Sequence, residues 1–192
     1  MKTLKIHTLI GTIALALIFI SCSKSESIAP TQSPPVNDSK DLSGAEAAFL
    51  LSTVEKQKMH SDVYNEMDLK AKDQIFTIMS EDDVQYKEML SAIVDKYGLD
   101  NPISDKISGE YEDHKIQATY DDFINNNNYN WEEMLLYAQK MEEMLITDLQ
   151  FHLANVSGHA DVSEIYNDLI KESKGQLEAL NKELRSIGDS NI

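Results

Sequence analysis

The sequence is short of cysteine, glycine and basic residues, and each shortage excludes something. Cys22 is the only cysteine, so no disulfide can form within the chain. The seven glycines build neither a Gly-x-Ser-x-Gly elbow nor a phosphate-binding loop. Nothing in the sequence therefore supports a hydrolase.

Acidic residues outnumber basic ones by 33 to 17, which gives a formal net charge of −16. Two of the lysines lie in residues 1–21, ahead of Cys22. The remainder has 15 basic residues and a formal charge of −18. This charge argues against nucleic acid and against an anionic membrane surface as partners. It is typical of a well-solvated protein surface.

The N-terminus has the pattern of a secretory signal. Lys2 and Lys5 precede an apolar run over residues 9–20, which ends at a small residue before Cys22. The run is too short for a comfortable membrane span. We therefore expect a signal peptide over residues 1–21 and an exported protein.

The segment Phe19-Ile20-Ser21-Cys22 resembles the lipobox of bacterial lipoproteins, although Phe19 stands where leucine is usual. The resemblance implies that Cys22 is lipidated and becomes the first residue of the mature chain. The protein would then be anchored to a membrane of the bacterial cell envelope, the outer membrane where the cell has one. The alternative is an ordinary signal peptide that is cleaved nearby, with Cys22 incidental.

Residues 22–42 are rich in serine, proline and asparagine and cannot bury a core. We expect a flexible tether there. The remaining residues, 43–192, amount to a single domain.

Four long amphipathic helical patterns and one short one follow, and no segment shows strand alternation. The expected helices span residues 43–69, 73–97, 113–124, 131–154 and 162–187. Capping boxes are expected to begin three of them, at Ser43 with Glu46, Asn130 with Glu133, and Asp161 with Glu164. The pattern predicts an all-α four-helix bundle in which a long crossover, carrying the short helix, joins the second and third long helices. That connectivity is the ferritin-like topology.

Each long helix places polar side chains on its apolar stripe. These interruptions are Glu55, in line with Leu51, Met59 and Asp62; Asp83 with Tyr86; Glu142; and Ser173 with Gln176. An acidic side chain on an apolar stripe costs free energy unless it is paired, protonated or bound to a metal. The interruptions therefore raise the question of a buried site. A structural hydrogen-bonded network, or exposure of some positions, is the simpler interpretation.

Three segments resemble a known family. They are Ser61-Asp62-Val63-Tyr64, Asp95-Lys96-Tyr97-Gly98-Leu99, and the eight residues from Glu142 to Leu149. Their order and spacing are similar to the ferritin-like family catalogued as domain of unknown function 2202, over about residues 42–184.

The resemblance implies a set of metal-ligand positions. Family members show a run of glutamates, which here is Glu55-Lys56-Gln57, and a Glu-Glu pair, which is kept as Glu142 and Glu143. Their Glu-x-x-His falls on Asp83 and Tyr86, and the histidine that follows Ser-x-x falls on Gln176, after Ser173. Both family histidines are thus absent.

These departures shape the expected metal chemistry. A ferritin-like di-metal site takes two glutamates and two Glu-x-x-His pairs. The three carboxylates expected here, Glu55, Asp83 and Glu142, suit hard cations, whereas a redox-active iron pair usually has imidazole too. The neighbours of this tentative site would be Tyr86, Glu143, Ser173 and Gln176.

The favoured function is a non-enzymatic, lipid-anchored envelope protein with a degenerate metal centre and no cofactor. One alternative is a ferritin-like protein that binds a divalent metal of the iron type. Another is a helical protein-binding module that uses its methionines. The sequence identifies no protein partner beyond the membrane anchor.

Replacing the cysteine tests the anchor. Cys22→Ala should leave the protein unlipidated and poorly retained in the membrane fraction, because no second apolar run is available to hold it there. Lipid labelling and membrane fractionation measure this. Unchanged labelling and retention in the variant would contradict the prediction.

Overall fold

The computed structural model describes residues 41–126 and 128–190. Within them the chain forms five helices and no strands. The helices are α1 (Gly44–Ala71), α2 (Gln74–Lys96), α3 (His114–Asn125), α4 (Trp131–Leu153) and α5 (Ala160–Ser190). The prediction of an all-α fold with a short helix in the crossover is confirmed. The predicted signal peptide, Cys22 and nearly all of the predicted tether lie outside the described residues.

Two of the three expected capping boxes are present. The Ser43 hydroxyl accepts the Glu46 N–H, and the Glu46 carboxylate accepts the Ser43 N–H. Asn130 and Glu133 make the same reciprocal pair at the start of α4. Each box satisfies donors that the first turn of a helix leaves free.

The third expected capping box, at Asp161 and Glu164, is wrong. Helix α5 begins at Ala160, so Asp161 lies inside its first turn. The Asp161 carboxylate instead accepts hydrogen bonds of 2.8 Å from Tyr97 Oη and from Lys96 Nζ. A tertiary contact with the end of α2 has replaced the local cap.

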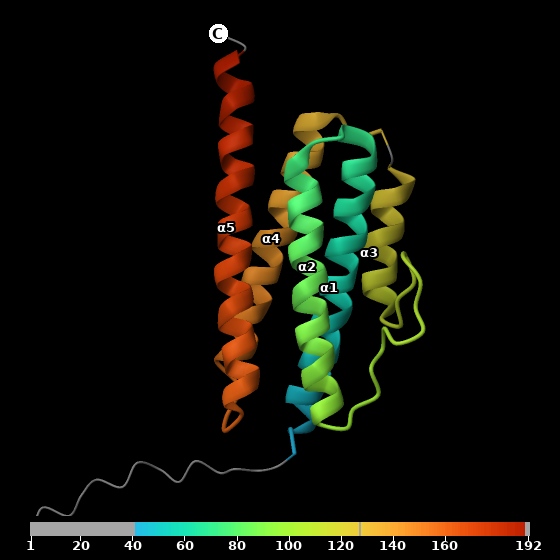
Figure 1. Ribbon diagram of the computed structural model, residues 1–192, viewed down its shortest axis with the longest axis vertical. Coiled ribbons are helices and arrows are strands. Elements are labelled where there is room, and N and C mark those ends of the chain that lie inside the picture. Colours follow the sequence, from blue (N-terminus) through green and yellow to red (C-terminus); the bar gives the residue numbers. More distant parts are fainter. Residues whose placement is uncertain (1–40, 127, 191–192) are drawn as a thin grey trace, which may run out of the picture. The chain divides into compact units, whose positions relative to one another are not determined.

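The helices pair as two antiparallel hairpins. Ser61 Oγ of α1 lies 3.3 Å from Ser80 Oγ of α2, and these helices are joined by a very short connection. In the same way Gln139 Nε2 of α4 donates to Asn181 Oδ1 of α5 at 3.2 Å. Figure 1 shows α2 beside α1 and α5 beside α4.

Helix α4 also runs antiparallel to α1. Lys56, early in α1, pairs with Asp148, late in α4, at 2.5 Å. Tyr64, which follows Lys56 in α1, donates to Glu142, which precedes Asp148 in α4. Since α2 and α4 both oppose α1, they run in the same direction. The chain must therefore return along the domain between α2 and α4.

The crossover makes this return along α1. The Gly109 N–H donates to the Asp62 carboxylate at 3.0 Å. Gly109 has a φ of +81°, and a Cβ there would lie 2.8 Å from the Tyr120 ring, so the position requires glycine. Helix α3 then lies beside α1 (Figure 1) and brings the chain to the start of α4, where Trp131 meets Phe76 at a ring distance of 5.5 Å.

Two apolar clusters fill the interior. One, the Phe76 cluster, also contains Tyr64, Met79, Phe123, Met134 and Leu180. The other, the Leu149 cluster, also contains Leu50, Val94, Leu145, Tyr166 and Leu169. Every long helix contributes to both clusters. None of the described helices is long and apolar enough to cross a membrane.

Candidate functional site

A layer of buried polar side chains lies between the two apolar clusters. On each long helix these residues fall near the point in the sequence where the members of one cluster give way to those of the other. We call this set the polar layer: Gln57, His60 and Tyr64 of α1, Asp83 of α2, Glu142 of α4, and Ser173 and Gln176 of α5. None of them is more than 6% exposed. Buried polar groups at this depth need partners or protons.

Glu142 receives a short hydrogen bond from Tyr64. The Tyr64 hydroxyl donates to Glu142 Oε1 at 2.5 Å. His60 Nδ1 lies 3.3 Å from the same oxygen, without the geometry of a hydrogen bond. Burial, and next the charge of Glu142, raise the pKa of the Tyr64 hydroxyl well above its usual value. Tyr64 therefore stays protonated and remains a donor.

The ionised form of Asp83 is strongly disfavoured. Burial, and after it the charge of Glu142, raise the pKa of Asp83 well above its usual value, with smaller contributions from Asp82 and Glu172. The nearby Gln176 amide lowers the pKa of Asp83. The two groups do not form a hydrogen bond of good geometry, since Gln176 Nε2 and Asp83 Oδ2 both lack a partner. When Asp83 is neutral, the interior does not contain a second negative charge beside Glu142.

A second pair of acids borders the layer. Burial, followed by the charge of Asp82 and a hydrogen bond with it, raises the pKa of Glu172. The repulsion between the two carboxyl groups disfavours the ionised form of Glu172.

Glu55 does not belong to this layer, contrary to the expectation from its stripe. Its Oε1 accepts the Glu112 N–H at 2.5 Å and the Asp113 N–H at 3.1 Å. The carboxylate is buried against the crossover and holds the chain just before α3 begins. The stripe that contains Glu55 and Asp62 faces the crossover, which periodicity alone could not distinguish from the core.

Two other expected neighbours also lie elsewhere. Tyr86 is half-buried, and burial raises its pKa, followed by the charges of Glu172 and Asp168. Because both of these acids belong to α5, Tyr86 faces α5 rather than Glu142. Glu143 is exposed. The structure brings Asp83 and Glu142 together, with Ser173 and Gln176 buried on α5.

Sequence reasoning missed three members of the layer, Gln57, His60 and Tyr64. A signal was available, because Leu50, Val54, Gln57, Ser61 and Tyr64 follow one another at alternating spacings of four and three. All five are buried. The true core line of α1 therefore passes through Gln57, two residues after Glu55.

The donor set does not fit a di-metal centre. Such a centre in a helical bundle uses four carboxylates and two histidines, whereas α5 turns only Ser173 and Gln176 into the layer. Across the described ranges no three His, Cys, Asp or Glu side chains are grouped closely enough to hold a metal ion. The unpartnered atoms His60 Nδ1, Asp83 Oδ2 and Glu142 Oε2 are the ones that a single cation would recruit.

The fold and this layer define an all-helical domain with a buried acidic centre. Residues 46–191 match the family described as an uncharacterized protein domain, DUF2202, and the chain belongs to that family.

One relative has also been solved. The chain is 23% identical to an uncharacterized protein, MJ0754, of Methanocaldococcus jannaschii, over 78% of this chain and 80% of the relative. The crystal structure of hypothetical protein MJ0754 from Methanococcus jannaschii superposes with a TM-score of 0.73 at 22% identity. It covers 77% of this chain and 83% of that one. The likeness shows a shared helical fold.

The bond between Tyr64 and Glu142 can be tested against a matched tyrosine. Tyr64→Phe should cost about 1–3 kcal/mol, because it leaves a buried carboxylate without its donor. Tyr166→Phe should cost less, since the equally buried Tyr166 hydroxyl makes no hydrogen bond of good geometry. Urea denaturation measures both. Equal losses for the two variants would contradict the assignment.

The raised pKa of Asp83 predicts a pH dependence of stability. The folded state binds more protons than the unfolded chain at every pH between their two pKa values. The free energy of unfolding should therefore fall as pH rises from about 4, the ordinary pKa of an aspartate. In Asp83→Asn this fall should become smaller, and the gain at neutral pH is about 1.4 kcal/mol for each unit by which folding raises the pKa of Asp83.

Urea denaturation across this pH range, with the exposed Glu81→Gln of the same helix as the control, measures the effect. A profile for Asp83→Asn that keeps the slope of the unmodified protein would show that Asp83 is ionised in the fold.

Proposed function

We propose that the protein is a lipid-anchored protein of the bacterial cell envelope, built on a ferritin-like bundle whose metal centre has become a non-enzymatic polar network. The anchor rests on Cys22 and the apolar run before it. The bundle and its centre rest on the arrangement of the four long helices.

The directions of the helices support the ferritin-like assignment. The α1–α2 and α4–α5 hairpins are antiparallel, and a long connection with its own short helix joins α2 to α4. A single long crossover between the second and third long helices is the connectivity of ferritin-like proteins. Their metal ligands project inward from all four helices, which is where the polar layer lies.

One observation carries the proposal of a degenerate centre. Where a metal would compensate the carboxylates, the raised pKa of Asp83 favours its neutral form, and the Tyr64 hydroxyl donates to Glu142. On α5 an amide, Gln176, stands at the position of the family's histidine, and amides do not bind transition metals strongly. Other polar atoms of the layer, Asp83 Oδ2 and Gln176 Nε2 among them, have no hydrogen-bond partner.

The alternative is a single divalent cation of the iron type. It is favoured by the buried atoms without partners, since Glu142 Oε2, Asp83 Oδ2 and His60 Nδ1 come from three different helices. A bound cation would supply the positive charge that protons supply here. Asp83 would then lose its proton, and His60 would turn its imidazole from Glu142 Oε1 toward the ion.

A binding module that presents methionines is less well supported. Most of the methionines in the described domain are buried: Met59, Met67, Met79, Met134 and Met141. Only Met89 and Met144 are largely exposed, on different helices. Their main contribution is therefore to pack the core.

Calorimetric titration of the full chain with Fe²⁺, Mn²⁺ and Ca²⁺ separates the first two functions. If the centre is a polar network, no stoichiometric binding should occur, and Glu142→Gln should cost little stability or raise it, because glutamine can still accept from Tyr64. Glu143→Gln is the matched control, since Glu143 is adjacent but exposed.

Binding of one ion that Glu142→Gln weakens tenfold or more, and that Glu143→Gln leaves unchanged, would overturn the proposal and establish the metalloprotein. Tight binding that neither substitution affects would place a metal site elsewhere in the protein.

A further inference from the structure

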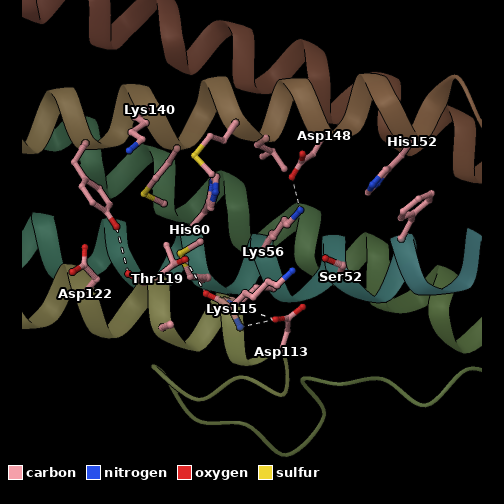
Figure 2. Close-up of a pocket in the computed structure, with 18 residues that line it drawn as sticks. Ser52, Lys56, His60, Asp113, Lys115, Thr119, Asp122, Lys140, Asp148 and His152 are labelled. Atoms are coloured by element: carbon pink, nitrogen blue, oxygen red, sulfur yellow. Dashed lines mark hydrogen bonds and ion pairs between the residues drawn. The ribbon is translucent and has the colours of Figure 1, made fainter. Parts of the chain in front are cut away.

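A groove of about 700 Å³ lies between α3 and α4, with α1 at its base (Figure 2). Three lysines and three aspartates line it, so their charges balance. Two of these residues, Lys140 and Asp148, come from the side of α4 that faces the groove (Figure 2). Met144 and Tyr137 line the same side of α4. The groove therefore opens beside a face of α4 that carries both charges and large apolar side chains.

This face of α4 exposes a stripe of large apolar residues, which we call the α4 stripe: Leu136, Met144 and Phe151. They are 47%, 56% and 61% exposed. Their spacings of eight and seven residues place them on one face of the helix. No other helix within residues 41–126 and 128–190 exposes more than two large apolar side chains. Apolar side chains that gather on one exposed face are typical of an interaction surface.

The α4 stripe is complementary to a second copy of itself. When two copies of a helix pack antiparallel across a two-fold axis, the residue at the axis meets its own copy. Residues at equal distances before and after the axis then meet each other. With Met144 at the axis, Lys140 of one copy stands opposite Asp148 of the other. Tyr137 stands opposite Phe151 in the same way, since each is seven residues from Met144.

Both charged residues are available for such a contact. Lys140 is exposed and forms no ion pair in the described part of the chain. Asp148 binds Lys56 through Oδ2, but its side chain is 45% exposed, and a carboxylate can accept from more than one donor. A symmetric dimer would therefore contain the Lys140–Asp148 pair twice, on the two sides of the axis.

The aromatic residues also suit this arrangement. Phe151 is largely exposed and meets only the edge of one neighbouring ring of α1, that of Phe49, at a centroid distance of 6.1 Å. Tyr137 is half-buried and packs against Phe123. Contact between Phe151 of one copy and Tyr137 of the other would bury apolar surface that each chain alone exposes, which favours association.

The charges around the α4 stripe favour a second copy over a lipid surface. Glu132, Glu133 and Glu143 are exposed on the same helix, and an anionic membrane would repel them. In a dimer Glu143, one residue from the axis, would approach its own copy. This repulsion, together with a contact that rests on one helix from each chain, limits the affinity.

We propose that the protein forms a reversible, symmetric dimer in which two α4 helices pack antiparallel about Met144. The partner copy covers the α4 stripe and the open side of the groove. The dimer depends neither on the lipid anchor nor on the state of the polar layer.

Single cysteines test the position of the axis. The full chain that carries Met144→Cys should be joined to a second copy by a short bifunctional maleimide, because the two thiols would lie next to each other. Leu136→Cys should be joined much less, since its two copies would lie about 24 Å apart, at eight residues of 1.5 Å on either side of the axis. The products are read by denaturing electrophoresis and mass spectrometry.

Two controls accompany this experiment. Met89→Cys places a thiol at a comparably exposed methionine of α2, where no self-complementary stripe predicts a contact. The unmodified chain, which has only Cys22, gives the background. Both should yield little covalent dimer.

Charge reversal tests the predicted pairing. Sedimentation equilibrium of the full chain in a mild detergent, from about 10 μM to about 1 mM, measures the dimer dissociation constant. Lys140→Glu should raise this constant about fivefold or more, because both ion pairs become repulsive. Adding Asp148→Lys should restore it to within about twofold, since both pairs re-form with exchanged signs. Lys174→Glu, at an exposed lysine of α5, should leave it unchanged.

Several results would overturn the proposal. They are a sedimentation profile of monomers alone over this range, equal cross-linking at positions 144, 136 and 89, and no recovery in the doubly reversed variant. Cross-linking of Met144→Cys in the expressing cells to a protein other than a second copy would instead assign the α4 stripe to a different partner.

Discussion

The complete burial of the Glu142 carboxylate is the constraint on which the rest of the interior depends. An unpaired charge at that depth would cost several kcal/mol, so the fold must bring it a donor and remove competing charges. Tyr64 supplies the donor from α1, and burial raises the pKa of Asp83 in α2, which favours its neutral form. Each solution requires α1, α2 and α4 to hold one register relative to one another. The two apolar clusters on either side of the layer maintain that register by excluding water.

Helix α1 serves two partners at once, and this explains why its buried residues are so often polar. One side, through Gln57 and Tyr64, joins the polar layer. Another side, through Glu55 and Asp62, accepts backbone N–H groups of the crossover. The part of the crossover before α3 has no regular structure, so its backbone N–H groups need acceptors. The carboxylates of α1 therefore hold the crossover in place, and the crossover in turn positions α3 and one wall of the groove.

Part of this arrangement could be predicted from the residues alone. Asn130 with Glu133 begins α4, and the helical periodicities predicted all five helices. Asp83 and Glu142 stand on apolar stripes, and both are buried. Local capping and periodicity suffice for such features because they depend on neighbours within a turn or two along the chain. Asp161 shows the limit, since a contact with Tyr97 outweighed its local role as a cap.

The sequence by itself determined the helices, their order, the length of the crossover, and the burial of acidic groups on apolar stripes. Only the tertiary structure decided which line of α1 faces the core, because Glu55 and Gln57 lie on stripes of similar polarity and the crossover covers one of them. It also decided that Tyr64, not Tyr86, donates to Glu142, since that bond joins residues 78 positions apart. The groove is likewise a tertiary product. It depends on the spacing between α3 and α4, which no local pattern in either helix encodes.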